Sequence, residues 1–276
     1  MKTEQHTTLI LGGTGKTGRR VAQRLRERGE PARIGSRTGT PPFDWNAPST
    51  WSEPLLRDVG AVYLAYYPDL AVPGAAEQIR GFSEQAVRHG VRRIVLLSGR
   101  GEHQVLPSEA AVRACGAEAT ILRAAFMCQN FSEGFLVDGV LGGEVVFPAG
   151  SVLEPFVDAD DLADVAVAAL LGNDHVGATY DLTGPRLLTF AEATAEIGAA
   201  TERELVYRQV SMEDYGQALS AHLPPEHIAF LVDLFRHVLD GHNSHIGGDL
   251  ERVLGRPARD FGAYARAAAA AGAWTR

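Results

Sequence analysis

Short apolar runs alternate with helical patterns through the first two thirds of the chain. The apolar runs predict strands near residues 7–12, 32–35, 61–65, 92–97 and 119–123. The segments between them carry apolar residues at helical spacing and predict helices near residues 17–29, 49–58, 74–89 and 107–115. This alternation is typical of βαβ units, so we expect a parallel sheet with helices on both faces and a ligand at the carboxyl ends of its strands.

The alternation becomes irregular after Leu122. Residues 145–150 and 154–157 look like short strands of a smaller lobe. A helix is expected at 159–171 and a strand at 180–182. The remainder is mainly helical, and amphipathic or alanine-rich patterns predict helices at 224–240 and 259–272.

Composition excludes several classes of protein. The net charge of −8 argues against a surface that neutralises nucleic-acid phosphates, and no apolar run reaches the length of a membrane span. The first residues lack the apolar core of a signal peptide. Cys115 and Cys128 are too few for a disulfide framework or a metal cage. We expect a cytoplasmic protein, a monomer or weak homodimer, with no nucleic-acid or membrane partner.

The segment Thr-Leu-Ile-Leu-Gly-Gly-Thr-Gly-Lys-Thr-Gly at residues 8–18 is the most informative motif. It joins a strand to a helix through glycines that fit both G-x-x-G-x-x-G and G-x-G-x-x-G. Such glycines let the backbone turn sharply and approach a pyrophosphate at the helix N-terminus. A P-loop would need a glycine where Ile10 stands, and a purely structural turn is the other alternative. The predicted dinucleotide-binding residues are Gly12, Gly13, Thr14, Gly15, Lys16, Thr17 and Gly18.

The end of the second predicted strand indicates which dinucleotide binds. NAD-specific folds place an acidic residue there to hold the ribose 2′-hydroxyl, but this strand ends in Ser36 and Arg37. A hydroxyl and a guanidinium suit a 2′-phosphate, which favours NADP(H). The alternative is that Arg37 is a solvated loop arginine.

With these motifs in place, the chain resembles the NmrA-like family of atypical short-chain dehydrogenases/reductases over nearly its whole length. Besides the glycine loop and Ser36-Arg37, the resemblance rests on segments 43–51, 61–65, 121–131, 156–164, 239–243 and 254–261. It implies that Asp44 and Trp45 lie beside the adenine and that Tyr66 and Tyr67 lie along the cofactor. Ordinary loop packing is the alternative for these four residues. The family lines its substrate pocket with residues that correspond here to Phe126, Met127, Gln129, Asn130 and Phe131, although Phe126 and Met127 also suit a core.

The proton donor of the wider superfamily is missing. Its reductases use a tyrosine followed four residues later by a lysine, and the chain has only two lysines, Lys2 and Lys16. No tyrosine has a lysine four positions on, and the segment from Ser98 to Ala119 contains neither residue type. Ordinary tyrosine–lysine catalysis is therefore out of reach for this chain.

Three residues after the fourth strand are candidates to replace that pair. Ser98 stands where the family often carries a serine that binds the substrate carbonyl, and it is also a candidate cofactor contact. Arg100 could stabilise a developing oxyanion or bind the cofactor, and His103 could donate a proton near neutral pH. Each also has a structural alternative. A substrate polarised by its own phenol would need orientation alone, which contributes several kcal/mol, up to about 7–11.

Other clusters favour structural roles. Asp158 is placed to cap the helix beginning at residue 159, and Asp160 and Asp161 to complement its dipole. His237, His242 and His245 are spaced by five and three residues, which gives no i,i+4 pair on one helix face, so we expect no metal site. The helix carrying Phe230, Leu231, Leu234 and Phe235 suits either the core or a second pocket wall.

These observations predict a Rossmann-type doubly wound parallel sheet with a smaller C-terminal α+β substrate lobe. The NADP-binding domain would span residues 1–182, with 127–158 contributing to the small lobe, and the lobe would span 183–276. The expected function is NADPH-dependent reduction of an aromatic ketone or quinone, a polyketide-like small molecule. The alternative is a non-catalytic NADP(H) sensor that binds a protein partner.

Overall fold

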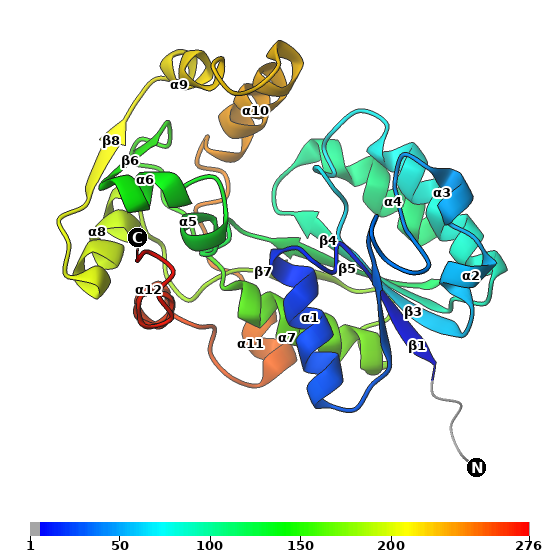
Figure 1. Cartoon of the computed structure of the whole chain (residues 1–276). Coiled ribbons are helices and arrows are strands. Elements are labelled where there is room, and N and C mark those ends of the chain that lie inside the picture. Colours follow the sequence, from blue (N-terminus) through cyan, green and yellow to red (C-terminus); the bar gives the residue numbers. More distant parts are fainter. Residues whose placement is uncertain (1–5, 276) are drawn as a thin grey trace.

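A six-stranded parallel sheet forms the centre of the molecule in the computed structural model, which describes residues 6–275 (Figure 1). Its strand order is β2-β1-β3-β4-β5-β7. The strands are β1 (Thr7–Leu11), β2 (Ala32–Gly35), β3 (Val59–Leu64), β4 (Arg93–Gly99), β5 (Glu118–Ala124) and β7 (Thr179–Leu182). The predicted doubly wound sheet is confirmed. Residues 1–5, including Lys2 and most of the segment inspected for a signal peptide, lie outside the described residues, as does Arg276.

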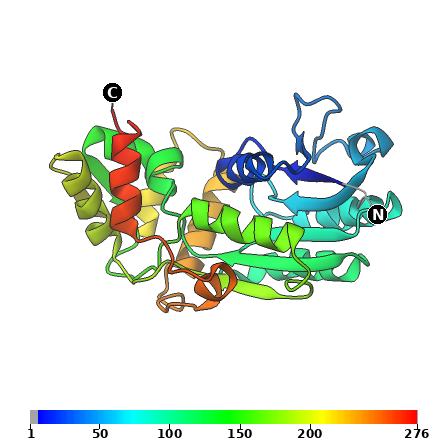
Figure 2. The same cartoon turned by 90° about the horizontal axis from the view of Figure 1, so that it is seen from below.

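Helices cover both faces of this sheet because successive strand side chains point in opposite directions. Leu9 and Leu11 pack toward one face and Ile10 toward the other. The helices against the first face are α2 (Glu53–Leu56), α3 (Ala75–Arg88) and α4 (Leu106–Ala114). Those against the second are α1 (Lys16–Glu27), α7 (Ala159–Leu171) and α11 (Asp249–Leu254), of which α7 is seen from below in Figure 2.

A smaller lobe lies beside the sheet and has its own phenylalanine-rich core. Its strands β6 (Glu144–Phe147) and β8 (Val206–Gln209) pair in parallel. Its helices are α5 (Asn130–Glu133), α6 (Val137–Gly142), α8 (Phe190–Thr201), α9 (Met212–Leu219), α10 (Pro225–Val238) and α12 (Phe261–Ala270). The helices predicted at 224–240 and 259–272 are thus confirmed, as is the expectation that the C-terminal part is mainly helical.

Three details differ from the predictions. Strand β8 was not foreseen, because Val-Tyr-Arg-Gln is mostly exposed and lacks a buried pattern. Residues 154–157 form only single bridges to neighbouring segments rather than a strand, and Pro155 lacks an N–H for a ladder. The helix predicted at 49–58 is split into the short 3₁₀ helix η1 (Pro48–Thr50) and α2.

The division at residue 182 remains a prediction. Helix α11, from the predicted second part, packs against α7 and β7 of the sheet. Between residues 6 and 275, no helix combines the length and the hydropathy that crossing a bilayer requires.

Candidate active site

The strand order defines a crevice at the carboxyl ends of β1 and β3. The chain leaves β1 for β2 on one side and returns to β3 on the other, so the connections diverge between β1 and β3. Ligands of doubly wound sheets bind at such a switch point. The glycine turn and Tyr66 both follow strands that end at this crevice.

The glycine turn brings β1 and α1 unusually close together. Gly12 has a φ of +69°, and a Cβ atom built on it would lie 2.8 Å from the carbonyl oxygen of Ala65. A Cβ atom on Gly18 would lie 2.3 Å from the carbonyl oxygen of Gly12. These positions exclude a side chain, so the glycines hold the helix against the strand as the dinucleotide motif requires.

The N-terminus of α1 is left open for an anion. Gly15 occupies the N-cap position without a side-chain cap, and the first turn contains no acidic residue. Thr14 and Gly15 are exposed. The Thr17 hydroxyl is buried and hydrogen-bonds Tyr63. Free N–H groups at a helix N-terminus bind phosphate, so this turn fits a pyrophosphate.

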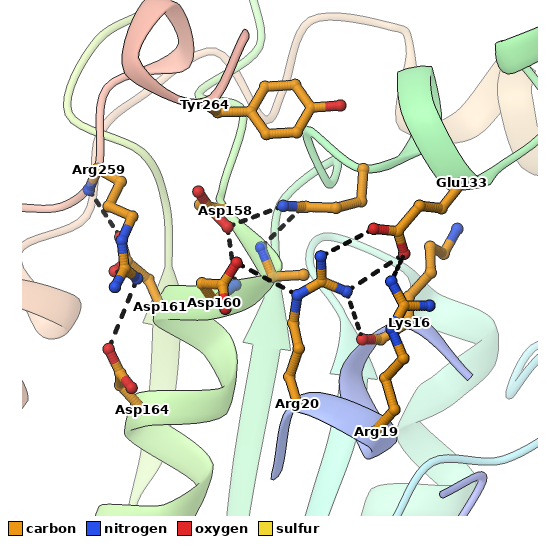
Figure 3. Close-up of polar contacts among 12 residues, drawn as sticks. Lys16, Arg19, Arg20, Glu133, Asp158, Asp160, Asp161, Asp164, Arg259 and Tyr264 are labelled. Carbon is orange, nitrogen blue, oxygen red and sulfur yellow. Dashed lines mark hydrogen bonds and ion pairs between the residues drawn. The ribbon is translucent and has the colours of Figure 1, made fainter. Parts of the chain in front are cut away.

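Lys16 and Arg20 link this turn to the segment that follows β5, and Figure 3 shows Arg20 between Glu133 and Asp160. Its Nζ atom donates a hydrogen bond of 2.6 Å to Asn130 Oδ1, and burial lowers the pKa of Lys16. Arg20 binds the carboxylate of Glu133 at 2.8 Å and also pairs with Asp160. A predicted cofactor residue and a predicted substrate residue, Lys16 and Asn130, are therefore in direct contact.

Arg37 stands at the end of β2 without a partner among residues 6–275, and its side chain is exposed. The loop behind it is closed because the Ser36 carbonyl oxygen accepts hydrogen bonds from the N–H groups of Gly39 and Phe43. A guanidinium held at this position with its donors available fits the 2′-phosphate of NADP(H).

The residues predicted beside the adenine mostly contact other residues of the protein. Asp44 Oδ1 accepts a hydrogen bond from the Asn46 N–H, and Trp45 is buried with its ring centre 4.8 Å from that of Tyr66. The Tyr66 hydroxyl donates to Gln78 at 2.5 Å, whereas Tyr67 is 72% exposed. Trp45 is thus a core residue, and the adenine contacts remain a prediction.

Ser98 belongs to a buried polar network at the end of β4. Its hydroxyl donates a hydrogen bond of 2.7 Å to Glu109, and Ser98 is only 3% exposed. Arg123 donates two hydrogen bonds, of 2.9 and 2.7 Å, to the same carboxylate. This arrangement satisfies a buried carboxylate, which favours the structural alternative for Ser98.

Arg100 is likewise paired within the protein. It donates to Asp181 at 2.6 Å and to the carbonyl oxygens of Asn243 and His245, and it is buried. These bonds fasten residues 243–245 to the sheet. The guanidinium is therefore an anchor rather than a free oxyanion donor.

His103 is exposed and lies against the C-terminal segment. Its ring centre is 4.6 Å from that of His237. His237 and His242 each place Nε2 within hydrogen-bond distance of the Gly101 carbonyl oxygen, at 3.0 and 3.2 Å. Because a carbonyl oxygen only accepts, both rings carry a proton on Nε2. The three rings therefore hold the loop after β4 in place.

Most tyrosine hydroxyls are also occupied. Tyr180 pairs with His175, Tyr207 donates to the Phe147 carbonyl oxygen, and Tyr264 pairs with Ser132, each at 2.8 Å. Burial raises the pKa of Tyr215, in the lobe, to about 12. These four tyrosines do not belong to the loop that follows β4.

Glu102 is a further titratable residue of this loop, and it belongs to no motif recognisable in the sequence. A Cβ atom built on Gly99 would lie 2.0 Å from Glu102 Oε1, so the carboxyl group folds back over the end of β4. Burial, with a smaller contribution from the charge of Asp69, raises the pKa of Glu102 to about 8. The sequence signal was Gly99 itself, which makes room for that carboxyl group.

The predicted substrate residues divide into two kinds. Gln129 bonds Asp158 and the Ala159 N–H, and Phe131 is fully buried, so both are structural. Phe126 and Met127 are half-buried. The Phe126 ring packs in a cluster with the rings of Phe135, Phe147, Phe156 and Phe190. Phe135 is 50% exposed, so the cluster reaches the surface.

A cavity of about 550 Å³ lies between α10 and the loops that follow β3 and β4. Residues 71–73 and Gln104 form one side, and Phe230 and Leu234 of α10 line the other. Phe235 is buried in the lobe core. Helix α10 is therefore both a core element and a cavity wall.

The aspartates at the start of α7 have structural roles, as expected. The Asp158 side chain accepts the Asp160 N–H, which confirms the predicted N-cap. Asp161 is fully buried and binds Arg256 and Arg259, while Asp164 pairs with Arg24. These carboxylates neutralise arginines rather than face an open site.

Comparison with known proteins finds relatives along the whole chain. The "Uncharacterized oxidoreductase YesF" of Bacillus subtilis is 30% identical and covers 97% of this chain and 96% of its own. An "NAD(P)H azoreductase" of Xenophilus azovorans is 28% identical and covers 95% and 98%. The Escherichia coli quinone oxidoreductase QOR2, in complex with NADPH, shares the fold, with a TM-score of 0.78, 19% identity, and coverage of 94% and 98%. No protein-family model matches the chain.

Proposed function

The chain belongs to the NmrA-like family of atypical short-chain dehydrogenases/reductases, and on that premise we propose that it reduces an aromatic ketone or a quinone with NADPH. It is an oxidoreductase, like the relatives that match it from end to end. Those names favour an enzyme over the alternative of a non-catalytic sensor.

The choice of cofactor rests on two features together: an open helix N-terminus, and an arginine that has no partner in the part of the chain that the structure describes. The backbone of residues 12–18 would hold the pyrophosphate, and Arg37 would hold the 2′-phosphate. Bound NADPH would supply the hydride. Lys16 and Asn130 would fix the position of the segment after β5 relative to the nucleotide turn.

The choice of an aromatic substrate rests on phenylalanines of the lobe. Phe126 and the half-exposed Phe135 form an edge-to-face pair in the lobe cluster, and Phe230 lines the cavity beneath α10, so all three offer rings for stacking. These apolar walls favour a flat ring system over a sugar or an acyl chain. Because Ser98 and Arg100 are occupied, the proton must come from the substrate's own phenol or from another protein group.

Two matched pairs of compounds test this proposal. We would follow NADPH oxidation with 1,4-naphthoquinone and its 5-hydroxy derivative juglone, and with 1-tetralone and 8-hydroxy-1-tetralone. The proposal predicts saturable turnover of at least one pair above the rate without enzyme. Tight NADPH binding with no turnover of any of the four would contradict it and would return attention to azo or imine substrates or to the sensor.

The same pairs test the substrate-assisted hypothesis. The hydroxylated member of each pair carries an internal hydrogen bond to its carbonyl oxygen, and the parent compound does not. Substrate assistance predicts much faster reduction of the hydroxylated member. Equal rates would show that the protein supplies the proton.

A further inference from the structure

The loop that follows β4 places a carboxyl group where the nicotinamide half of the cofactor would lie. The 2′-phosphate site is at β2, and the pyrophosphate site is at β1. An extended dinucleotide therefore continues across β3 toward β4, about 14 Å from β2 at the usual spacing of strands. Glu102 lies three residues beyond the end of β4, at that end of the crevice.

The carboxyl group of Glu102 is held against the strand end and has no hydrogen-bond or ion-pair partner among residues 6–275. It occupies the space next to Gly99, with Oε1, Cδ and Oε2 at 2.0, 2.2 and 2.6 Å from a Cβ atom built there. Any side chain at position 99 would displace it. The residue is half-buried and close in sequence to Gln104, which lines the cavity beneath α10.

The described charged groups around this loop include no cation that pairs with Glu102. Arg100 binds Asp181, and Arg123 on β5 binds Glu109. From the C-terminal segment, His237 and His242 each place Nε2 within hydrogen-bond distance of the Gly101 carbonyl oxygen, and the His103 ring lies against that of His237 at a tilt. From the loop after β3, Asp69 adds a negative charge that opposes ionisation of Glu102.

We propose that the Glu102 carboxyl group is the acid that protonates the oxygen of the substrate carbonyl, in place of the missing tyrosine. This inference rests on the proposed function, since it needs a carbonyl substrate. Among the other candidates, Ser98 and Arg100 are committed to protein partners. Glu154 is only 3% exposed and accepts the Phe126 N–H, so it lies too deep to reach a substrate.

The chemistry balances without a further reactant. Bound NADPH would supply a hydride, which carries two electrons, to the carbonyl carbon, and the C=O π electrons would move onto oxygen. The Glu102 O–H bond breaks, its proton joins that oxygen, and the carboxylate regains a proton from water. A quinone takes up the same hydride and proton to become its hydroquinone. Burial beside Asp69 keeps Glu102 protonated at neutral pH, because it raises the pKa to about 8.

The test uses 1,4-naphthoquinone, which has no phenol, with the Glu102→Gln variant. Glutamine keeps the shape of the side chain but cannot give up a proton. We expect kcat to fall by about 10²–10⁴-fold with an unchanged Kd for NADPH. Glu84→Gln, an exposed site on α3, is the matched control and should leave both values unchanged.

The pH profile separates an acid from a structural residue. The wild-type kcat should be constant at low pH and fall as the pH rises through the pKa of Glu102, since the reaction needs the protonated form. Asp69→Asn removes the smaller of the two contributions that raise this pKa, so the falling limb should move to lower pH. Glu102→Gln should lose the limb. A limb that persists in Glu102→Gln would overturn the proposal.

A measurement without turnover completes the test. In unliganded protein with ¹³C-labelled glutamate side chains, one carboxyl resonance should titrate near pH 8 and be absent from Glu102→Gln. Titration of Glu102 in the ordinary acidic range would overturn the inference. Wild-type enzyme that reduces juglone but not 1,4-naphthoquinone would also overturn it while upholding the proposed function. If none of the carbonyl compounds is reduced, the proposed function itself fails.

Discussion

The nucleotide turn, residues 12–18 with Arg37, and residues 98–100 at the end of β4 both lie at carboxyl ends of strands of the same sheet, but their polar groups differ in whether they have protein partners. In the nucleotide turn the helix N-terminus is uncapped and Arg37 has no partner among residues 6–275. At the end of β4, Ser98 and Arg100 are bonded to protein groups. Polar groups left unpaired in a folded chain indicate a ligand, and paired ones indicate structure.

The largest effect should follow from breaking the nucleotide turn. Gly18→Ala places a Cβ atom 2.3 Å from the Gly12 carbonyl oxygen, so the strand and helix must separate. We expect loss of detectable NADPH binding and a free energy of unfolding lower by about 1–3 kcal/mol. The control is Gly142→Ala, where no atom lies within 4 Å, and it should behave as wild type in calorimetric titration and denaturant unfolding. Normal NADPH binding by Gly18→Ala would remove the turn from the site.

The second prediction concerns the anchor at the end of β4. Arg100→Ala leaves the Asn243 and His245 carbonyl oxygens and Asp181 without their donor. We expect the free energy of unfolding to fall by about 1.5–3 kcal/mol, while the folded protein still binds NADPH. Arg236→Ala, which removes an exposed ion pair with Glu213, should cost under about 1 kcal/mol. Unchanged stability of Arg100→Ala with impaired NADPH binding would assign Arg100 to the cofactor instead.

The third prediction sharpens the role of Arg37. Arg37→Ala removes a charged donor for the 2′-phosphate, which NADH lacks, so only NADPH binding should weaken. Hydrogen bonds to charged groups contribute about 1.5–3 kcal/mol, which corresponds to a rise in Kd of about 10–100-fold. Parallel titrations with both dinucleotides measure this, with Arg28→Ala at the opposite end of α1 as the control. Equal loss of NADPH and NADH affinity would contradict the assignment.

The smallest effect is expected at Ser98. Ser98→Ala removes one hydrogen bond to Glu109, which keeps both bonds from Arg123. We expect the free energy of unfolding to fall by about 1 kcal/mol and kcat to change less than about tenfold. A loss of kcat by 10²-fold or more, with unchanged stability, would restore Ser98 as a catalytic residue.

The fold was predictable where apolar patterns are strong. Apolar runs such as the one that contains Val62 and Leu64 predict buried parallel strands, and the spacing of the glycines predicts the turn. Strand β8 was not predictable, because its exposed polar residues are held by pairing with β6 rather than by burial.

The candidate site was predictable only in part. The roles of residues 12–18 and Arg37 could be predicted because they depend on residue type and on spacing within a short segment. Arg100 is occupied by hydrogen bonds to carbonyl oxygens 143 and 145 residues away along the chain. The raised pKa of Glu102 depends on burial and on the nearby charge of Asp69. Such long-range pairing decides which polar groups remain available, and no local pattern contains it.

The most direct test is a crystal structure of the protein with NADP⁺. We expect the pyrophosphate at the N–H groups that open α1, the 2′-phosphate against Arg37, and the nicotinamide ring beside the loop that carries Glu102. A cofactor that leaves Arg37 free, or a nicotinamide ring turned away from the end of β4, would contradict these assignments.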